Sequence, residues 1–112
     1  MAAQFLYLTT KGRTTGEPRR IEIWFVELRG CHYVVAEMGE EAGWVKNLAR
    51  DAAVTFSVGT RANRELALCS TRAMARALRE AGDTPRIAEV RKAMDAKYRW
   101  SEGLVVEISR SS

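Results

Sequence analysis

Two strand-forming segments separated by only two residues constrain the fold of this chain more than any other feature. In residues 19–28 branched and aromatic residues alternate with polar ones, a period near two that indicates a strand with one buried face. Residues 31–37 resume strand-forming sequence directly after Arg29 and Gly30. A two-residue connection is typical of a β-hairpin, so we expect these two strands to pair antiparallel.

The same criteria predict the other elements. We expect strands over 4–10, 53–58 and 104–109, an amphipathic helix over 42–50 and a second helix over 84–99, with Thr84 as its N-cap and Pro85 at its first position. Residues 11–18 and 59–63 carry the glycine, proline and small polar residues of loops. The element order has hairpin-length connections and no βαβ rhythm, which favours an antiparallel barrel over a parallel sheet.

One segment, 64–81, leaves two alternatives open. Alanines alternate strictly with larger residues over 72–78, which favours one bulged strand. The same stretch is rich in strong helix formers, which favours a strand followed by a helix. We favour the strand.

Length and composition indicate a single domain over 1–112. The chain is 46% hydrophobic and 29% charged, which excludes wholesale disorder and permits a packed core. It has no apolar run long enough to span a membrane and no secretory leader, so we expect no membrane span and a cytoplasmic location. Cys31 and Cys69 lack CxxC spacing, and we expect both to be buried small hydrophobes.

Several kinds of active site lack their parts. His32 is the only histidine, so we assign it a structural or surface role, and the acidic residues of 37–41 lack the spacing of a calcium loop; we expect no metal site. No GxSxG, P-loop or GxGxxG pattern is present, which disfavours acyl transfer, nucleotide hydrolysis and a Rossmann site.

Two segments could bind an anion. Lys11, Arg13, Arg19 and Arg20 surround the glycines and threonines of loop 11–18, a combination that suits phosphate; the alternative is a solvated basic loop. The turn at 37–41 leads into the predicted helix 42–50, whose amino end could also receive an anion. On that helix the pattern places Trp44, Val45 and Leu48 on one face and Lys46, Asn47 and Arg50 on the other. Tryptophans here, as at positions 24 and 100, are more often core anchors than cofactor supports.

The motifs of this chain resemble those of the deazaflavin-dependent nitroreductase family. Residues 8–19, LTTKGRTTGEPR, are similar to the family's T-x-G-R-x-[ST]-G-x-P-R pattern. Farther along, VVAEMG at 34–39, WVKNL at 44–48, VTF at 54–56 and KYRW at 97–100 are similar to its strand, glycine turn, helix, next strand and helix end. The resemblance covers nearly the whole chain, in order.

This resemblance implies an antiparallel split β-barrel of the flavin-reductase type with two helices, usually a homodimer. It implies cofactor-binding residues in two groups: Arg13, Thr14, Thr15 and Arg19 near the phosphate-bearing tail, and Ala36, Met38, Gly39, Trp44 and Asn47 along the ring or ribityl side. Lys11 and Gly16, in the same loop as the first group, are also expected to bind the cofactor. Trp24 matches a position where relatives carry an aromatic residue near the substrate. Thr14 stands where relatives often have lysine, and Glu40 where they often have a second glycine.

The implied activity is hydride transfer from a reduced deazaflavin, coenzyme F420, or from FMN, to a quinone, nitroaromatic or enone acceptor. In such enzymes the protein supplies binding and orientation, so the lack of a triad or metal ligands is expected. The alternative is a non-catalytic split barrel that binds a phosphorylated or hydrophobic small molecule. A nucleic-acid partner ranks last, because stacking aromatics interleaved with basic residues are not evident along one strand.

Overall fold

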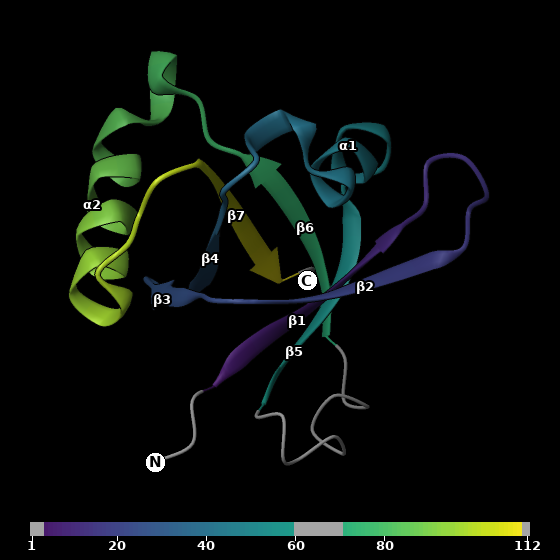
Figure 1. Cartoon of the computed structure of the whole chain (residues 1–112), viewed down its shortest axis with the longest axis horizontal. Coiled ribbons are helices and arrows are strands. Elements are labelled where there is room, and N and C mark those ends of the chain that lie inside the picture. The colour runs from purple at the N-terminus through teal and green to yellow at the C-terminus, as the bar shows by residue number, and fades with distance from the viewer. Residues whose placement is uncertain (1–3, 60–70, 111–112) are drawn as a thin grey trace.

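The computed structural model describes residues 4–59 and 71–110, which contain seven strands, one 3-10 helix and two α-helices. The strands form one curled sheet, α1 lies at one end of it, and α2 packs on its outer side (Figure 1). In chain order they are β1 (Phe5–Lys11), β2 (Pro18–Ile23), β3 (Val26–Leu28), β4 (Cys31–Ala36), η1 (Gly39–Glu41), α1 (Gly43–Arg50), β5 (Ala53–Gly59), β6 (Thr71–Ala77), α2 (Glu80–Tyr98) and β7 (Leu104–Arg110).

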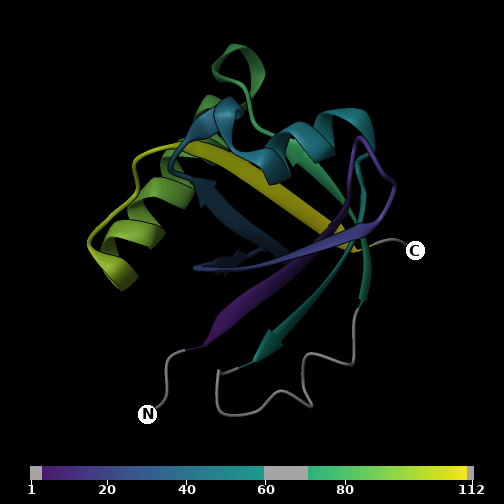
Figure 2. The same ribbon diagram turned by 45° about the vertical axis from the view of Figure 1, so that its right-hand side comes forward.

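The strand order forces the sheet to curl. The seven strands pair antiparallel in the order β2-β1-β5-β6-β7-β4-β3, so β2 and β3 are its two edges. Laid flat, these edges would lie about 29 Å apart at the usual strand spacing, yet only Trp24 and Phe25 join them, a connection that reaches roughly 10 Å. The sheet therefore rolls up until its edges nearly meet, which is the split barrel that the sequence predicted (Figures 1 and 2).

The predicted strand over 19–28 is wrong in one respect, because it is broken at Trp24 and Phe25. The backbone N–H of Phe25 donates to the Tyr98 hydroxyl at 3.2 Å, and that hydroxyl and the Lys97 ammonium donate to the Phe25 carbonyl, each at 2.9 Å. Side chains of α2 thus satisfy the polar groups that a continuous strand would have paired in a ladder. The predicted hairpin is confirmed, with Leu28 opposite Cys31 and Arg29 and Gly30 both at positive φ.

The barrel interior is filled from the inward faces of the strands and closed at one end by α1. The buried cluster includes Leu6 and Leu8 of β1, Phe56 of β5 and Leu48 of α1, with Trp44 packed against it. The predicted helix 42–50 is confirmed, but the assignment of Asn47 to its polar face is wrong, since only 4% of Asn47 is exposed. Its amide makes hydrogen bonds inside the protein, which makes its burial favourable.

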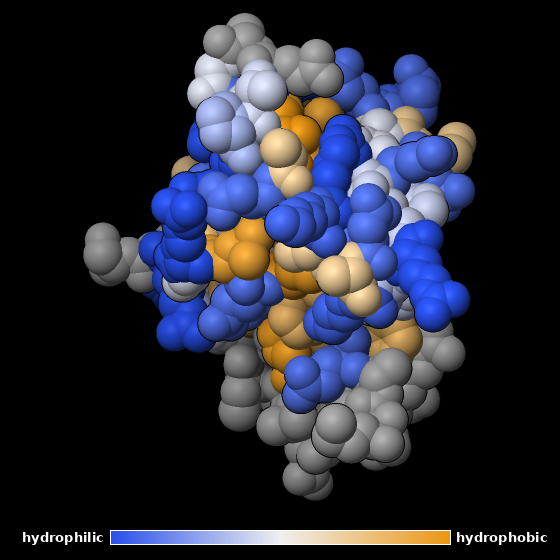
Figure 3. Space-filling model, turned by 90° about the vertical axis from the view of Figure 1, so that its left-hand side faces the viewer, coloured by the Kyte–Doolittle hydropathy of each residue, from blue (hydrophilic) through white to orange (hydrophobic). Residues whose placement is uncertain are grey.

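The second helix covers the outer face of β4 and β7. Ile87, Val90 and Met94 are buried against Tyr33 and Val105, so these two strands are covered on both faces. Figure 3 views the molecule from this side and shows mainly hydrophilic side chains, with apolar ones visible between them. No helix among the residues described is long and apolar enough to cross a membrane.

The start of α2 corrects the prediction of Thr84 as its N-cap. The helix begins one turn earlier, where the Asp83 carboxylate accepts from the Arg79 backbone N–H at 2.9 Å and the Asp83 N–H donates to the Arg79 carbonyl at 2.8 Å. Pro85 therefore lies inside the helix, and Figure 1 shows the first turn leaving the axis of the rest.

The ambiguous segment 64–81 is settled in its second half. Thr71–Ala77 is a strand, as favoured, and the helix already begins at position 80, so one bulged strand to 81 is wrong. The rest of that segment, 64–70, lies outside the described residues, as does Cys69. The predicted loop 59–63 is wrong at Gly59, which ends β5, and its other residues lie outside the described part of the chain. Cys31 is only half-buried and lies 3.6 Å from the Ser109 hydroxyl, so the expectation of full burial is wrong for it.

Candidate functional site

The basic loop between β1 and β2 is held against α1 by one buried amide. The Oδ1 atom of Asn47 accepts from the Arg13 backbone N–H at 3.2 Å and from its Nη1 at 3.0 Å, while Nδ2 donates to the buried Thr10 hydroxyl at 3.0 Å. The Arg13 guanidinium also donates to the Gly43 carbonyl at 3.3 Å. Asn47 therefore joins strand, loop and helix at one point.

The loop has its own internal geometry as well. The Gly12 N–H donates to the Glu17 carbonyl at 2.8 Å, and the Gly16 N–H donates to the Gly12 carbonyl at 2.8 Å. The backbone of Gly16 has a positive φ of 75°. A Cβ at Gly12 would lie 2.9 Å from the Glu17 carbonyl oxygen, so the tight turn needs glycine there. The Thr15 hydroxyl accepts from the Glu17 N–H at 3.2 Å.

This loop and the start of α1 enclose a cavity of about 360 Å³, which we call the cationic cavity. It is lined by Gly12, Arg13, Thr14, Thr15, Arg19, Ile21, Gly43, Trp44 and Asn47. All four residues predicted around a phosphate-bearing tail, Arg13, Thr14, Thr15 and Arg19, thus share one cavity. Two guanidinium groups, hydroxyls and the amino end of a helix suit an anionic group.

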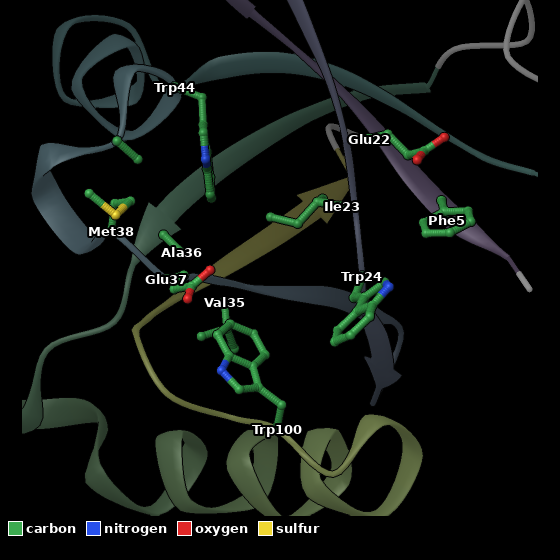
Figure 4. Close-up of a pocket in the computed structure, with 11 residues that line it drawn as sticks. Phe5, Glu22, Ile23, Trp24, Val35, Ala36, Glu37, Met38, Trp44 and Trp100 are labelled. Atoms are coloured by element: carbon green, nitrogen blue, oxygen red, sulfur yellow. The ribbon is translucent and has the colours of Figure 1, made fainter. Parts of the chain in front are cut away.

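A second cavity of about 630 Å³, which we call the aromatic cavity, adjoins the first, since Trp44 lines both (Figure 4). It is lined by Phe5, Glu22, Ile23, Trp24, Val35, Ala36, Glu37, Met38, Ala42, Trp44 and Trp100. All three tryptophans of the chain line it. Flat apolar walls of this kind suit an aromatic ring system.

The walls opposite Trp44 are held by the end of α2. Trp24 is stacked on Tyr98 with ring centroids 4.6 Å apart, and Trp100 meets Trp24 edge-on at 6.1 Å. Trp24 remains 41% exposed, so it is a rim residue and not the core anchor that tryptophan usually is. The break between β2 and β3, which the Tyr98 hydroxyl stabilises, is what places Trp24 there.

Three of the predicted cofactor residues lie elsewhere. Lys11 and Gly16 line a different cavity, with Pro18 of β2 and residues of β5 and β6, and Gly39 lines none of those described. Sequence reasoning assigned no site role to Phe5, Glu22, Val35, Glu37, Ala42 or Trp100, nor to Gly12, Ile21, Ile23 and Gly43. Gly12, Val35, Glu37 and Trp100 did carry a signal, because each lies within one of the motifs that resemble the family's.

Two buried titratable groups lie outside these cavities. Burial raises the pKa of Tyr33 to about 12, with a further contribution from its 2.7 Å hydrogen bond to Glu107. Burial lowers the pKa of His32, and the carboxylate of Glu27, 3.1 Å from Nε2, partly opposes that shift. His32 packs between Phe25 and Phe56, consistent with the structural role expected for it. Among residues 4–59 and 71–110, no cluster of three or more potential metal ligands occurs.

The curled sheet and its two helices define a split β-barrel. Solved structures share the fold at low sequence identity. The heme storage protein HutZ from Vibrio cholerae is 13% identical with a TM-score of 0.72, over 96% of this chain and 82% of its own. A FAD-binding protein from Mesorhizobium loti is 11% identical with a TM-score of 0.70, and the match covers 99% of this chain and 83% of that one. An F420 reductase is 12% identical with a TM-score of 0.61, and the match covers 99% of this chain and 89% of that one.

The sequence itself assigns the family. Residues 1–99 match the model of the F420H(2)-dependent quinone reductase family, and the chain belongs to that family. It is therefore an oxidoreductase, and its cofactor is the deazaflavin F420. No curated protein matches the chain significantly.

Proposed function

We propose that this protein transfers hydride from F420H2 to a quinone, with the cofactor lying along the cationic and aromatic cavities. The observation that carries the proposal is that the two cavities adjoin at Trp44 and differ in chemistry, one with two arginines and one with three tryptophans. An anionic tail and a planar ring on one molecule need such a pair of neighbouring environments.

Different residues of the two cavities would bind different parts of the cofactor. Arg13 and Arg19 would pair with the anionic tail, the hydroxyls of Thr14 and Thr15 would accept or donate hydrogen bonds beside it, and Trp44 would separate the tail from the ring. Ala36 and Met38, at the end of β4, would line the ring side. Asn47 would act by holding Arg13 in place, because its amide is already bonded to the loop and to Thr10. When bound, the reduced deazaflavin supplies the hydride, and the protein binds and orients.

We place the acceptor in the outer part of the aromatic cavity, beside Trp24 and Trp100. These two rings are in edge-on contact with each other and both line the cavity, so together they offer a flat acceptor an aromatic wall next to the cofactor ring. Quinones are the acceptors that the family name implies. Nitroaromatic and enone acceptors, and FMN in place of F420, are finer predictions from the resemblance.

The homodimer and the cytoplasmic location also remain predictions. Met38 is 69% exposed and lies with Trp24 at the rim of the aromatic cavity, so a second copy could cover apolar surface there. Sedimentation equilibrium of the purified protein tests the dimer, and fractionation of expressing cells tests the location.

The proposed function is tested by titrating the protein with F420 and by following F420H2 oxidation with a 1,4-naphthoquinone. We expect saturable binding and turnover, and a weaker F420 affinity in Arg13→Ala with little change in stability, because the side chain is exposed at the surface of the loop. An Arg13→Ala affinity equal to that of the wild type would contradict the placement of the tail. No binding and no turnover would overturn the function itself.

A further inference from the structure

The aromatic cavity carries negative charge and no positive charge. Two carboxylates, Glu22 and Glu37, stand among its lining, and none of its lining residues in the described part of the chain is lysine or arginine. The cationic cavity next to it has the opposite character, with Arg13 and Arg19 and no carboxylate in its lining. The two ends of the site are therefore electrostatically opposite.

Glu22 contributes less than Glu37 to the negative charge beside the tryptophans of the aromatic cavity. Its carboxylate accepts a hydrogen bond from the Tyr7 hydroxyl at 2.9 Å. Figure 4 shows it beside Phe5, pointing away from the tryptophans. The negative charge on the tryptophan side of the cavity thus comes from Glu37, which is exposed to solvent.

Glu37 differs from the other acidic residues of the same turn. Glu40 is paired with Arg79 at 2.5 Å and Glu41 with Lys46 at 3.8 Å. Glu37 makes no such pair with any residue in 4–59 or 71–110, and it follows directly on β4, whose pairing with β7 ends at Ala36. In Figure 4 its carboxylate lies between Trp44 and Trp100.

Two cations of α2 hydrogen-bond to backbone carbonyls behind Trp24 and Trp100 and keep their charge, but they do not line the aromatic cavity. Arg91 donates to the carbonyls of Ser101 and Gly103, and Lys97 donates to the carbonyl of Phe25. An acceptor entering the aromatic cavity therefore meets a carboxylate and aromatic faces, both of which repel anions and attract cations.

We propose that Glu37 selects acceptors by charge, so that the enzyme reduces neutral or cationic quinones and rejects quinones that carry a sulfonate or carboxylate. This proposal rests on the proposed function and names the substrate class of its acceptor end. It requires that the quinone ring enter beside Glu37, where a like charge at a few ångströms disfavours the anionic substrate.

The test uses three acceptors built on one 1,4-naphthoquinone ring: unsubstituted, sulfonated, and carrying a trimethylammonium group. Each is assayed with F420H2 in the wild type, in Glu37→Gln and in Glu41→Gln, which removes the same charge from the same turn but outside the cavity. Comparing variants acceptor by acceptor cancels the differences in redox potential between the quinones. Binding is measured separately, without F420, from quenching of the three tryptophans that line the cavity.

We expect Glu37→Gln to raise the kcat/KM ratio of the sulfonated to the neutral quinone roughly five- to tenfold and to lower the cationic-to-neutral ratio by a similar factor. The effect should shrink at high salt, and the Kd values should follow the same order. Equal ratios in Glu37→Gln and wild type, or an equal change in Glu41→Gln, would overturn the role of Glu37. Failure of the wild type to oxidise F420H2 with any of the three would overturn the proposed function instead.

Discussion

Asn47→Ala tests whether the buried amide holds the basic loop on α1. The change removes three hydrogen bonds: one to the Thr10 hydroxyl at 3.0 Å and two from Arg13 at 3.0 and 3.2 Å. At about 1 kcal/mol net for each bond, the free energy of unfolding should fall by about 2–3 kcal/mol. For a domain of this size that corresponds to a loss of roughly 10 °C in melting temperature.

Arg13→Ala is the matched control for this change. It removes the guanidinium but keeps the bond from its backbone N–H to Asn47, so we expect it to cost less than about 1 kcal/mol. F420 affinity should fall in both variants, whereas stability should fall clearly only in Asn47→Ala. Urea unfolding and F420 titration of the same samples separate the two effects.

A double-mutant cycle decides whether the bond to Thr10 carries part of this energy. Thr10→Val removes the acceptor while keeping the shape of the side chain, and Thr10 is only 1% exposed. We expect a coupling energy of about 1 kcal/mol between positions 10 and 47. A coupling energy near zero would show that the bond from Asn47 to Thr10 contributes nothing to stability. An Asn47→Ala variant as stable as Arg13→Ala would refute the claim that the Asn47 amide holds the loop on α1.

Two further predictions concern the barrel. Burial lowers the pKa of His32, whereas the unfolded chain keeps a value near 6.5, so the unfolded state binds the proton more readily. The free energy of unfolding should therefore fall as the pH drops below about 6.5 and stay constant above it, which urea unfolding from pH 8 to 5 would measure. His32→Leu should flatten this slope, and an unchanged slope in that variant would show that another group titrates. Gly103 has a φ of 139°, and a Cβ there would lie 2.2 Å from the Ala36 carbonyl oxygen, so Gly103→Ala should destabilise by about 3 kcal/mol or more and disturb the cavity wall at Ala36. Gly82→Ala, in α2 with no atom near the added Cβ, should instead stabilise by about 0.5–1 kcal/mol in the same melts; similar effects of both changes would contradict the steric reasoning.

Much of the local structure was readable from the sequence because local rules decide it. The alternation in 19–28, the strand-forming sequence of 31–37 and the Arg29-Gly30 connection between them specify a hairpin wherever the rest of the chain goes. The heptad-like spacing of Ile87, Val90 and Met94 likewise specifies a helix with one buried face, and these residues are buried.

The errors occur where a distant segment changes a local preference. Alternation alone predicts one strand through Trp24 and Phe25, but Tyr98 and Lys97, more than seventy residues away, take over the polar groups of Phe25. The helical wheel alone places Asn47 with the charged residues of α1, but the loop at Arg13 and the strand at Thr10 supply partners that make its burial favourable.

The candidate site shows the same division. The sequence by itself determined which segments carry charge, glycine and aromatic rings, and its motifs alone assign the family over residues 1–99. Only the tertiary structure decided that Trp44 stands between an arginine-lined and a tryptophan-lined cavity, and that Lys11 and Gly16 face a different one. The reason is that side-chain period and turn chemistry act over a few residues, whereas cavity walls meet only when the two edges of the sheet, joined at Trp24 and Phe25, close the barrel.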